Sequence, residues 1–118
     1  MSQLNLIIVQ GRVTKDCELK YSAKGNPYLK FTIANNFFKN VNGKKEKKAS
    51  FFNVTAWDKI AEIFAPHLKK GSHIIVAGRI DVNIFTTENG EKKTYIGITA
   101  NNIEFFTYDN EEENKKTA

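Results

Sequence analysis

The stretch that decides the fold runs from residue 49 to residue 85 and reads ASFFNVTAWDKIAEIFAPHLKKGSHIIVAGRIDVNIF. Its first part, residues 49–57, is rich in aromatic and β-branched residues, which favours a strand. The next part, residues 58–68, has apolar residues spaced for one helical face, at Ile60, Ile63, Phe64 and Leu68. Residues 72–85 then return to the period of a strand, with apolar residues at Ile74, Val76, Ile80 and Val82. The stretch therefore predicts strand, helix and strand in immediate succession.

The ends of the expected helix carry signals of their own. Asp58 can cap the first turn, and Gly71 can end the helix after Lys69 and Lys70. Pro66 lacks an N–H group, so we expect it to bend or shorten the final turns.

Outward from this stretch, the chain reads as strands separated by turns. Residues 4–14 predict a long strand and residues 18–21 a short one, while residues 28–38 alternate as a half-buried strand does. Residues 92–106 form the last expected strand. The turn signals are Lys24-Gly25-Asn26-Pro27, Asn42-Gly43 and Asn89-Gly90.

A short echo links the first strand to the strand after the helix, since IIVQGRV at 7–13 resembles IIVAGRI at 74–80. Glycine inside a strand often marks a bulge or a bend, and a small barrel needs bent strands to turn its corners. The expected order is therefore three long strands, one helix and two further long strands. This all-β order is that of the OB-fold, a five-stranded, partly open Greek-key barrel that binds oligonucleotides. A four-stranded α+β domain is the alternative, but it would normally have a second helix.

Composition and charge narrow the class of partner. The chain has 118 residues, of which 41% are hydrophobic, so it can form one domain with its own core. The net charge is +5, and acidic residues gather in residues 109–118, which leaves residues 1–108 more basic than the whole. A basic body suggests a polyanionic partner, although a solvated, lysine-rich surface would have the same composition.

The two ends of the chain differ from the body. Residues 109–118 contain no apolar residue except Ala118 and predict a short, flexible, acidic and polar tail after a domain at 1–108. The N-terminus carries no basic and apolar signal region, and no apolar run approaches the roughly 20 residues that span a bilayer. We therefore expect a cytoplasmic protein associated with the nucleoid.

Metal and catalytic sites are not indicated. Cys17 is the only cysteine, so it has no internal disulfide partner, which fits a reducing compartment. With His67 and His73 it makes a poor metal set, because no pair shows ligand spacing. A P-loop and a G-x-S-x-G motif are also absent. We expect neither a metal, nor a cofactor, nor an enzymatic activity.

Exposed aromatic residues are the first candidates for function, because single-strand binding needs flat side chains on which bases stack. Phe51 and Trp57 share the more polar face of their strand with Asn53 and Thr55, so we expect them to be exposed; alternatively, Trp57 caps the barrel end above the helix. Phe85 precedes a polar hairpin tip, where little core is available. Candidates beside a basic loop are Phe37 and Phe38, of which we expect at least one to face DNA.

Basic residues are the second requirement, because a groove for single strands must also hold phosphates. Lys20, Arg12 and Arg79 lie on or beside strands, which would hold them in place, although structural ion pairs are their alternative role. The remaining candidates follow the helix, lie in the expected loop at 39–48, or follow the last turn: Lys69, Lys70, Lys44, Lys45, Lys47, Lys48, Lys92 and Lys93.

Taken in order, these segments resemble one family. NLIIVQGRVTKDCELKY, FTIANN, SFFNVTAWDKIAE, LKKGSHIIVAGRI and a Phe85 before a polar hairpin are similar to the bacterial single-stranded DNA-binding proteins. The resemblance covers about residues 3–106, and the joint set of motifs is highly specific.

The resemblance implies an OB-fold that assembles into homotetramers, as dimers of dimers, around which single-stranded DNA wraps in replication, recombination and repair. It implies base stacking by Phe51, Trp57 and Phe85, with a further aromatic near residues 37 and 38. It also implies a basic contact at Lys20 and a dimer-forming edge that includes Leu6 and Ile8. Family members usually end in an acidic tip with an apolar motif that recruits replication and repair proteins; here residues 111–118 read EEENKKTA, without that motif.

Two other functions remain open from the residues. A barrel of this kind could act as a protein–protein module in primosome or recombination assembly, with DNA binding secondary. An enzyme that acts on DNA is a more distant alternative.

Overall fold

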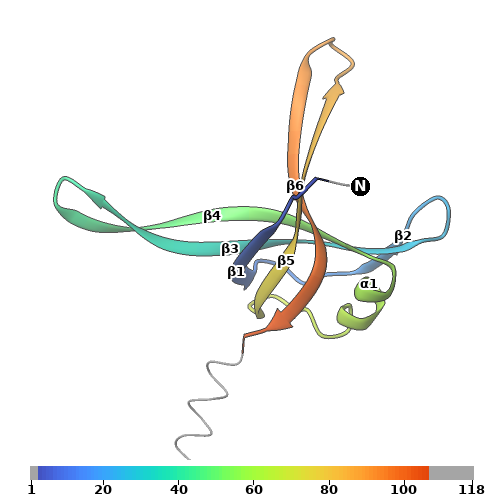
Figure 1. Cartoon of the computed structure of the whole chain (residues 1–118), viewed down its shortest axis with the longest axis horizontal. Coiled ribbons are helices and arrows are strands. Elements are labelled where there is room, and N and C mark those ends of the chain that lie inside the picture. Colours follow the sequence, from blue (N-terminus) through green and yellow to red (C-terminus); the bar gives the residue numbers. More distant parts are fainter. Residues whose placement is uncertain (1–2, 107–118) are drawn as a thin grey trace, which may run out of the picture.

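A computed structural model describes residues 3–106 of the chain (Figure 1). The strands are β1 Ile7–Val13, β2 Leu19–Tyr21, β3 Pro27–Val41, β4 Lys44–Trp57, β5 His73–Thr86 and β6 Lys92–Phe105. The one helix of these residues, α1 Asp58–Phe64, lies between β4 and β5, as the sequence predicts. The expected domain boundary at residue 108 and the tail at 109–118 lie outside the described residues.

The long strands close into a five-stranded barrel. The sheet order is β1-β5-β6-β4-β3-β2, and an additional pairing of β1 with β3 joins the two sides. The β4–β6 pairing is parallel and short, Val54 with Ile98 and Thr55 with Thr99, whereas every other pairing is antiparallel. This arrangement is the expected OB-fold, and β2 is a short addition to the free edge of β3.

The barrel is filled by the inward-facing side chains of its five strands, together with Ala61 from α1 and Leu68 from the turn after it. Alternation along the strands determines which side chains these are. The buried strand residues are Val13, Leu29, Phe31, Ile33, Val54, Ala56, Ile74, Val76, Ile98, Ala100 and Ile103.

Both glycines of the sequence echo lie where strands approach closely. A Cβ atom on Gly78 would lie 2.0 Å from the carbonyl oxygen of Thr99, and the β5–β6 register shifts between Ala77 and Gly78. A Cβ atom on Gly11 would lie 2.7 Å from the Ala34 oxygen, next to the point where β1 also pairs with β3. The prediction of an irregularity at a strand glycine is thus confirmed at Gly78.

Two long hairpins extend from the barrel, β3–β4 to the left and β5–β6 upward in Figure 1. The first turns at Asn42 and Gly43, whose φ angles are 52° and 80°, as expected for a tight Asn-Gly turn. The prediction of a lysine-rich loop at 39–48 is wrong, because Lys44 and its neighbours continue the ladder up to the pair Val41–Lys44. Backbone pairing with β3 overrides the low strand preference of lysine.

The helix is shorter than expected and its ends differ from the prediction. It stops at Phe64, two residues before Pro66, which agrees with the expected shortening. Asp58 is the first helical residue rather than the cap, and no side chain caps the helix. Gly71, with φ +90°, lies in the turn before β5 and does not end the helix. Ile63 is exposed instead of packing on the core.

Candidate nucleic-acid interface

The outer face of β4 presents aromatic and polar side chains in alternation. Phe51 is 65% exposed and Trp57 is 39% exposed, whereas Val54 and Ala56 point into the core. Asn53 lies between the two aromatics on the same face. The prediction that Phe51 and Trp57 lie on the exposed face of this strand is confirmed.

Strand β3 extends this face, because cross-strand partners in an antiparallel pair point the same way. Tyr28 lies opposite Trp57, and their ring centroids are 5.1 Å apart. Lys30 lies opposite Thr55, and Ala34 lies opposite Phe51. The outer faces of β3 and β4 therefore form one surface that carries aromatic, basic and hydroxyl groups.

The register also separates Phe37 from Phe38. Phe38 pairs with Lys47 and has the same parity along β3 as Ala34 and Tyr28, so it lies on the face of Phe51. Phe37 pairs with Lys48 and has the parity of the core residues of β3. Phe38 is 69% exposed and Phe37 is 41% exposed. The structure thus brings Phe38, and not Phe37, onto the face of the other candidate aromatics.

The β5–β6 hairpin contributes a second wall. Phe85, which is exposed, pairs with Lys93, and Asn83 pairs with Tyr95 on the same face. Arg79 starts this row, where its Nε lies 3.2 Å from an oxygen of Asp81. The other carboxylate oxygen of Asp81 accepts a hydrogen bond from the Thr99 hydroxyl. Arg79 therefore forms a structural ion pair, which is the alternative to phosphate binding that the sequence left open.

Shallow hollows connect the two walls. One hollow of about 210 Å³ includes Trp57, Tyr95 and Lys30, and another of about 250 Å³ includes Asn53, Tyr95 and Lys30. A third, of about 460 Å³, continues from Lys30 over Tyr28 to Lys20. Since each hollow shares residues with the next, they form one groove across the outer faces of β3, β4, β5 and β6, which reaches Lys20 of β2. We call it the aromatic groove.

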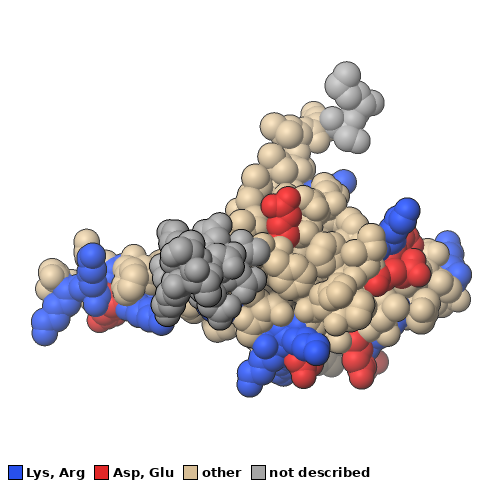
Figure 2. All heavy atoms as spheres, turned by 90° about the horizontal axis from the view of Figure 1, so that it is seen from below, with Lys and Arg blue, Asp and Glu red and all other residues tan. Residues whose placement is uncertain are grey.

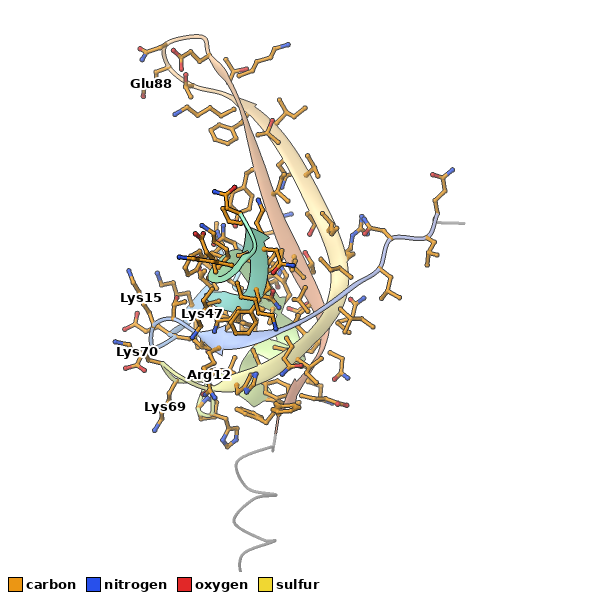
Figure 3. The ribbon with its side chains drawn as sticks, turned by 90° about the vertical axis from the view of Figure 1, so that its left-hand side faces the viewer. Arg12, Lys15, Lys47, Lys69, Lys70 and Glu88 are labelled. Atoms are coloured by element: carbon orange, nitrogen blue, oxygen red, sulfur yellow. The ribbon has the colours of Figure 1, made fainter. Side chains whose placement is uncertain are left out.

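Two sets of predicted basic residues lie outside the aromatic groove. Arg12 donates a hydrogen bond to the Gly71 carbonyl oxygen at 3.0 Å, and Lys69 and Lys70 lie near it (Figure 3), whereas Lys47 belongs to the β3–β4 hairpin. Basic side chains also gather along the β3–β4 hairpin (Figure 2).

On that hairpin, Lys44 and Lys48 lie on the opposite face from Phe38, and Lys48 pairs with Glu46 at 3.3 Å. Lys45 and Lys47 have the parity of the Phe38 face. Lys92 is the cross-strand partner of Thr86, next to Phe85.

Three residues of the groove did not emerge from the sequence as candidates. Tyr28 and Lys30 alternate with buried Leu29 and Phe31, so the period-2 pattern of β3 could have placed them outside. Alternation does not identify Tyr95, because Tyr95 and its neighbour Ile96 are both exposed where the hairpin leaves the barrel.

Burial raises the pKa of the Cys17 thiol, and the neighbouring charge of Asp16 raises it further. Within residues 3–106, no group of three or more His, Cys, Asp or Glu side chains could hold a metal ion. The same residues include no helix long and apolar enough to cross a membrane.

Comparison with known proteins identifies relatives. The Single-strand binding protein family matches residues 4–106. A single-stranded DNA-binding protein of Borreliella burgdorferi is 31% identical over 91% of this chain and 72% of its own length. One of Fusobacterium nucleatum is 33% identical over 86% and 66%, and one of Streptococcus pneumoniae is 36% identical over 86% and 64%. The chain thus spans about two thirds of the length of these relatives.

A solved structure shows the same fold. The chain superposes on the structure titled "Plasmodium falciparum SSB complex with ssDNA" with a TM-score of 0.80, covering 90% of this chain and 97% of that one, at 23% identity. This likeness supports the OB-fold, and the sequence relatives support the resemblance noted from the motifs. The chain belongs to the single-strand binding protein family.

Proposed function

We propose that this chain binds and protects single-stranded DNA, without sequence preference, in replication, recombination and repair. The observation that carries the proposal is the aromatic groove, in which exposed Trp57 lies with Lys30 and Lys20, while exposed Phe51 lies on the same outer face of β4. Three relatives are named single-stranded DNA-binding proteins, which supports the same ligand.

The exposed aromatic and basic groups of the groove and the neighbouring hairpins explain why the sequence of the DNA should matter little. Bases of every kind have a flat face that can stack on Phe51, Trp57, Phe85 or Phe38, and lysine side chains contact the phosphates that all nucleotides share. Stacking and charge together give affinity without reading base edges. In this proposal binding is the whole activity, and the protein works in the cytoplasm on exposed strands of the nucleoid.

We further propose that the chain assembles into a homotetramer. The face of the β5–β6 hairpin opposite Phe85 exposes Val82, Ile84 and Ile96, and the N-terminal edge exposes Leu6 and Ile8. Exposed apolar patches on a soluble protein often mark interaction surfaces, and closed symmetric oligomers are the common way to bury them. Assembly through these patches would leave the opposite, aromatic face of the hairpin open to DNA.

Fluorescence of Trp57, the only tryptophan, tests DNA binding directly. We expect poly(dT) to quench it, with an affinity that falls as salt rises. Light scattering on the same samples should give the mass of four chains for the protein alone, and the mass of four chains plus the bound DNA with oligo(dT). Absence of quenching and of salt-sensitive binding would overturn the proposal, and a monomeric mass would overturn the tetramer. Cleavage of labelled DNA in magnesium by the pure protein would show that binding is not the whole activity.

A pair of variants separates stacking from charge. Phe85→Ala should weaken binding while leaving the salt dependence nearly unchanged, because no charge is removed. Lys20→Ala should lower the slope of log affinity against log salt by about 0.7, the value for one phosphate contact on a single strand. The reverse pattern would mean that the two roles are assigned wrongly.

A further inference from the structure

Tyr95 lies over a glycine on the floor of the aromatic groove. A Cβ atom built on Gly97 would lie 3.0 Å from the Tyr95 Cε1 atom and 3.4 Å from its hydroxyl oxygen. Residues two apart on a strand share a face, so the ring lies along β6 in the space that a side chain at position 97 would fill. Gly97 itself is buried, whereas Tyr95 remains 38% exposed. The glycine therefore allows the ring to lie low against the sheet and still contact solvent.

Tyr95 lies between two candidate stacking residues. On one side it shares a hollow with Trp57. On the other side it is two residues from Lys93, the cross-strand partner of Phe85. Without Tyr95, the bases stacked on Trp57 and on Phe85 would have no aromatic surface between them along β6.

A basic side chain accompanies the ring. Lys30 lines both hollows that Tyr95 lines, and it lies opposite Thr55 on the neighbouring strands. Asp81, which lines the hollow of Trp57 and Tyr95, is engaged by Arg79 and by the Thr99 hydroxyl, whereas Asp16 and Glu18 line the next hollow with Lys20. A flat ring with a lysine beside it is the pair of groups that one nucleotide of a single strand requires, one for the base and one for the phosphate.

We propose that Tyr95, seated on Gly97, is a further base-stacking residue between Trp57 and Phe85, and that Lys30 binds the adjacent phosphate. This inference rests on the proposed function, since it adds one nucleotide position to the same groove. In this proposal, the role of Gly97 is to leave room for the Tyr95 ring.

The test compares oligo(dT) affinity, by titration of Trp57 fluorescence, among variants of the full chain. Tyr95→Ala should weaken binding about 5- to 150-fold, the range expected for loss of one stacked base. Tyr95→Phe should retain the wild-type affinity, because the ring is kept and only the hydroxyl is lost. Tyr21→Ala is the matched control, since Tyr21 is an exposed tyrosine on β2 that lines none of the three hollows. Lys30→Ala should lower the salt slope by about 0.7, and Tyr95→Ala should leave it unchanged.

Photo-crosslinking provides a readout that needs no substitution. An oligonucleotide with 5-iododeoxyuridine should form an adduct that mass spectrometry assigns to Tyr95, because halogenated uracils couple to aromatic rings stacked on them. Wild-type affinity in Tyr95→Ala, or adducts on other aromatics without one on Tyr95, would overturn the inference while leaving single-strand binding intact. Failure of the wild-type chain to bind any single strand would instead overturn the proposed function.

Discussion

The assignment of Phe38, and not Phe37, to the DNA-binding face is the sharpest consequence of the β3–β4 register. The two residues are adjacent, chemically identical and both exposed, so sequence position and composition cannot separate them. Their side chains nevertheless point to opposite faces of the hairpin, since Phe38 pairs with Lys47 and Phe37 with Lys48. We therefore predict that Phe38→Ala weakens binding of oligo(dT), whereas Phe37→Ala does not.

The expected size of the effect follows from what each substitution removes. Loss of one stacked base costs about 1–3 kcal/mol, so the dissociation constant of Phe38→Ala should rise about 5- to 150-fold. Phe38 is largely exposed in the free protein, so its truncation removes little buried surface and should change the free energy of unfolding by no more than about 0.5 kcal/mol. The loss should therefore appear in binding and not in folding.

Titration of Trp57 fluorescence at two salt concentrations, with urea unfolding of each variant, checks this prediction. The wild type, Phe37→Ala and Phe38→Ala should share one salt slope, because neither substitution changes a charge. Equal losses in both variants, or a larger loss for Phe37→Ala, would refute the argument from register. A large drop in unfolding free energy for Phe38→Ala alone would show that its ring packs in the fold instead of stacking on bases.

Three further predictions concern charge, packing and the thiol. Asp81→Asn removes a negative charge from the groove and releases Arg79 from its ion pair. DNA binding should therefore tighten, and the slope of log affinity against log salt should steepen by about 0.7. An unchanged slope would mean that Arg79 contacts no phosphate. Gly78→Ala would place a Cβ atom 2.0 Å from the Thr99 oxygen, so we expect a loss of at least about 2 kcal/mol in urea unfolding, and wild-type stability would contradict this. Burial raises the pKa of Cys17, so less thiolate is present at pH 8 and iodoacetamide should react more slowly than with a free peptide; equal rates in folded and denatured protein would argue against burial.

The order of elements and the faces of the central strands could be predicted from the sequence. Alternation in residues 51–57 separates Phe51 and Trp57 from buried Val54 and Ala56, because β4 has core on one side and solvent on the other. The alternation expected for residues 28–38 is also present in β3, where Phe31 and Ile33 are buried. Where a strand belongs to the closed barrel, local pattern and tertiary environment agree.

One prediction failed where strands leave the barrel. Lysines at 44–48 look like loop residues, yet they form a strand, because the ladder with β3 satisfies their backbone groups. This error concerns the length of the β3–β4 hairpin, which depends on pairing between distant segments and not on local preference. The β5–β6 hairpin also extends past the barrel, so Val82 is exposed although it continues the apolar alternation that starts at buried Ile74.

The candidate site could be predicted only in part, because it also depends on pairing between distant segments. Phe51 and Trp57 could be placed on an exposed face from their own strand. Tyr95 could not be placed, because its position depends on Gly97 beneath it and on Lys30 from another strand. A groove assembled from several strands can be described only once their registers are known.

Strand β5 shows how one register serves both proposed roles of the protein. Beyond the barrel its two faces differ completely, with Asn83 and Phe85 on one side and Val82 and Ile84 on the other. A slip of one residue would exchange the faces, turning the apolar one toward DNA and the aromatic one toward a partner copy.

A side chain supports this register at the point where the hairpin leaves the barrel. The β1–β5 ladder ends at the pair Ile7–Gly78, and just beyond it the Asn5 side chain forms hydrogen bonds with the backbone of β5. Its amide nitrogen donates to the Ile80 carbonyl oxygen at 2.8 Å, and its oxygen accepts from the Ile80 N–H at 2.9 Å. One side chain thus continues the ladder for a further residue and holds the backbone of Ile80 in place. Asn5 bonds only backbone groups, so the register itself is set by the β1–β5 and β5–β6 ladders, which Asn5 extends by one residue.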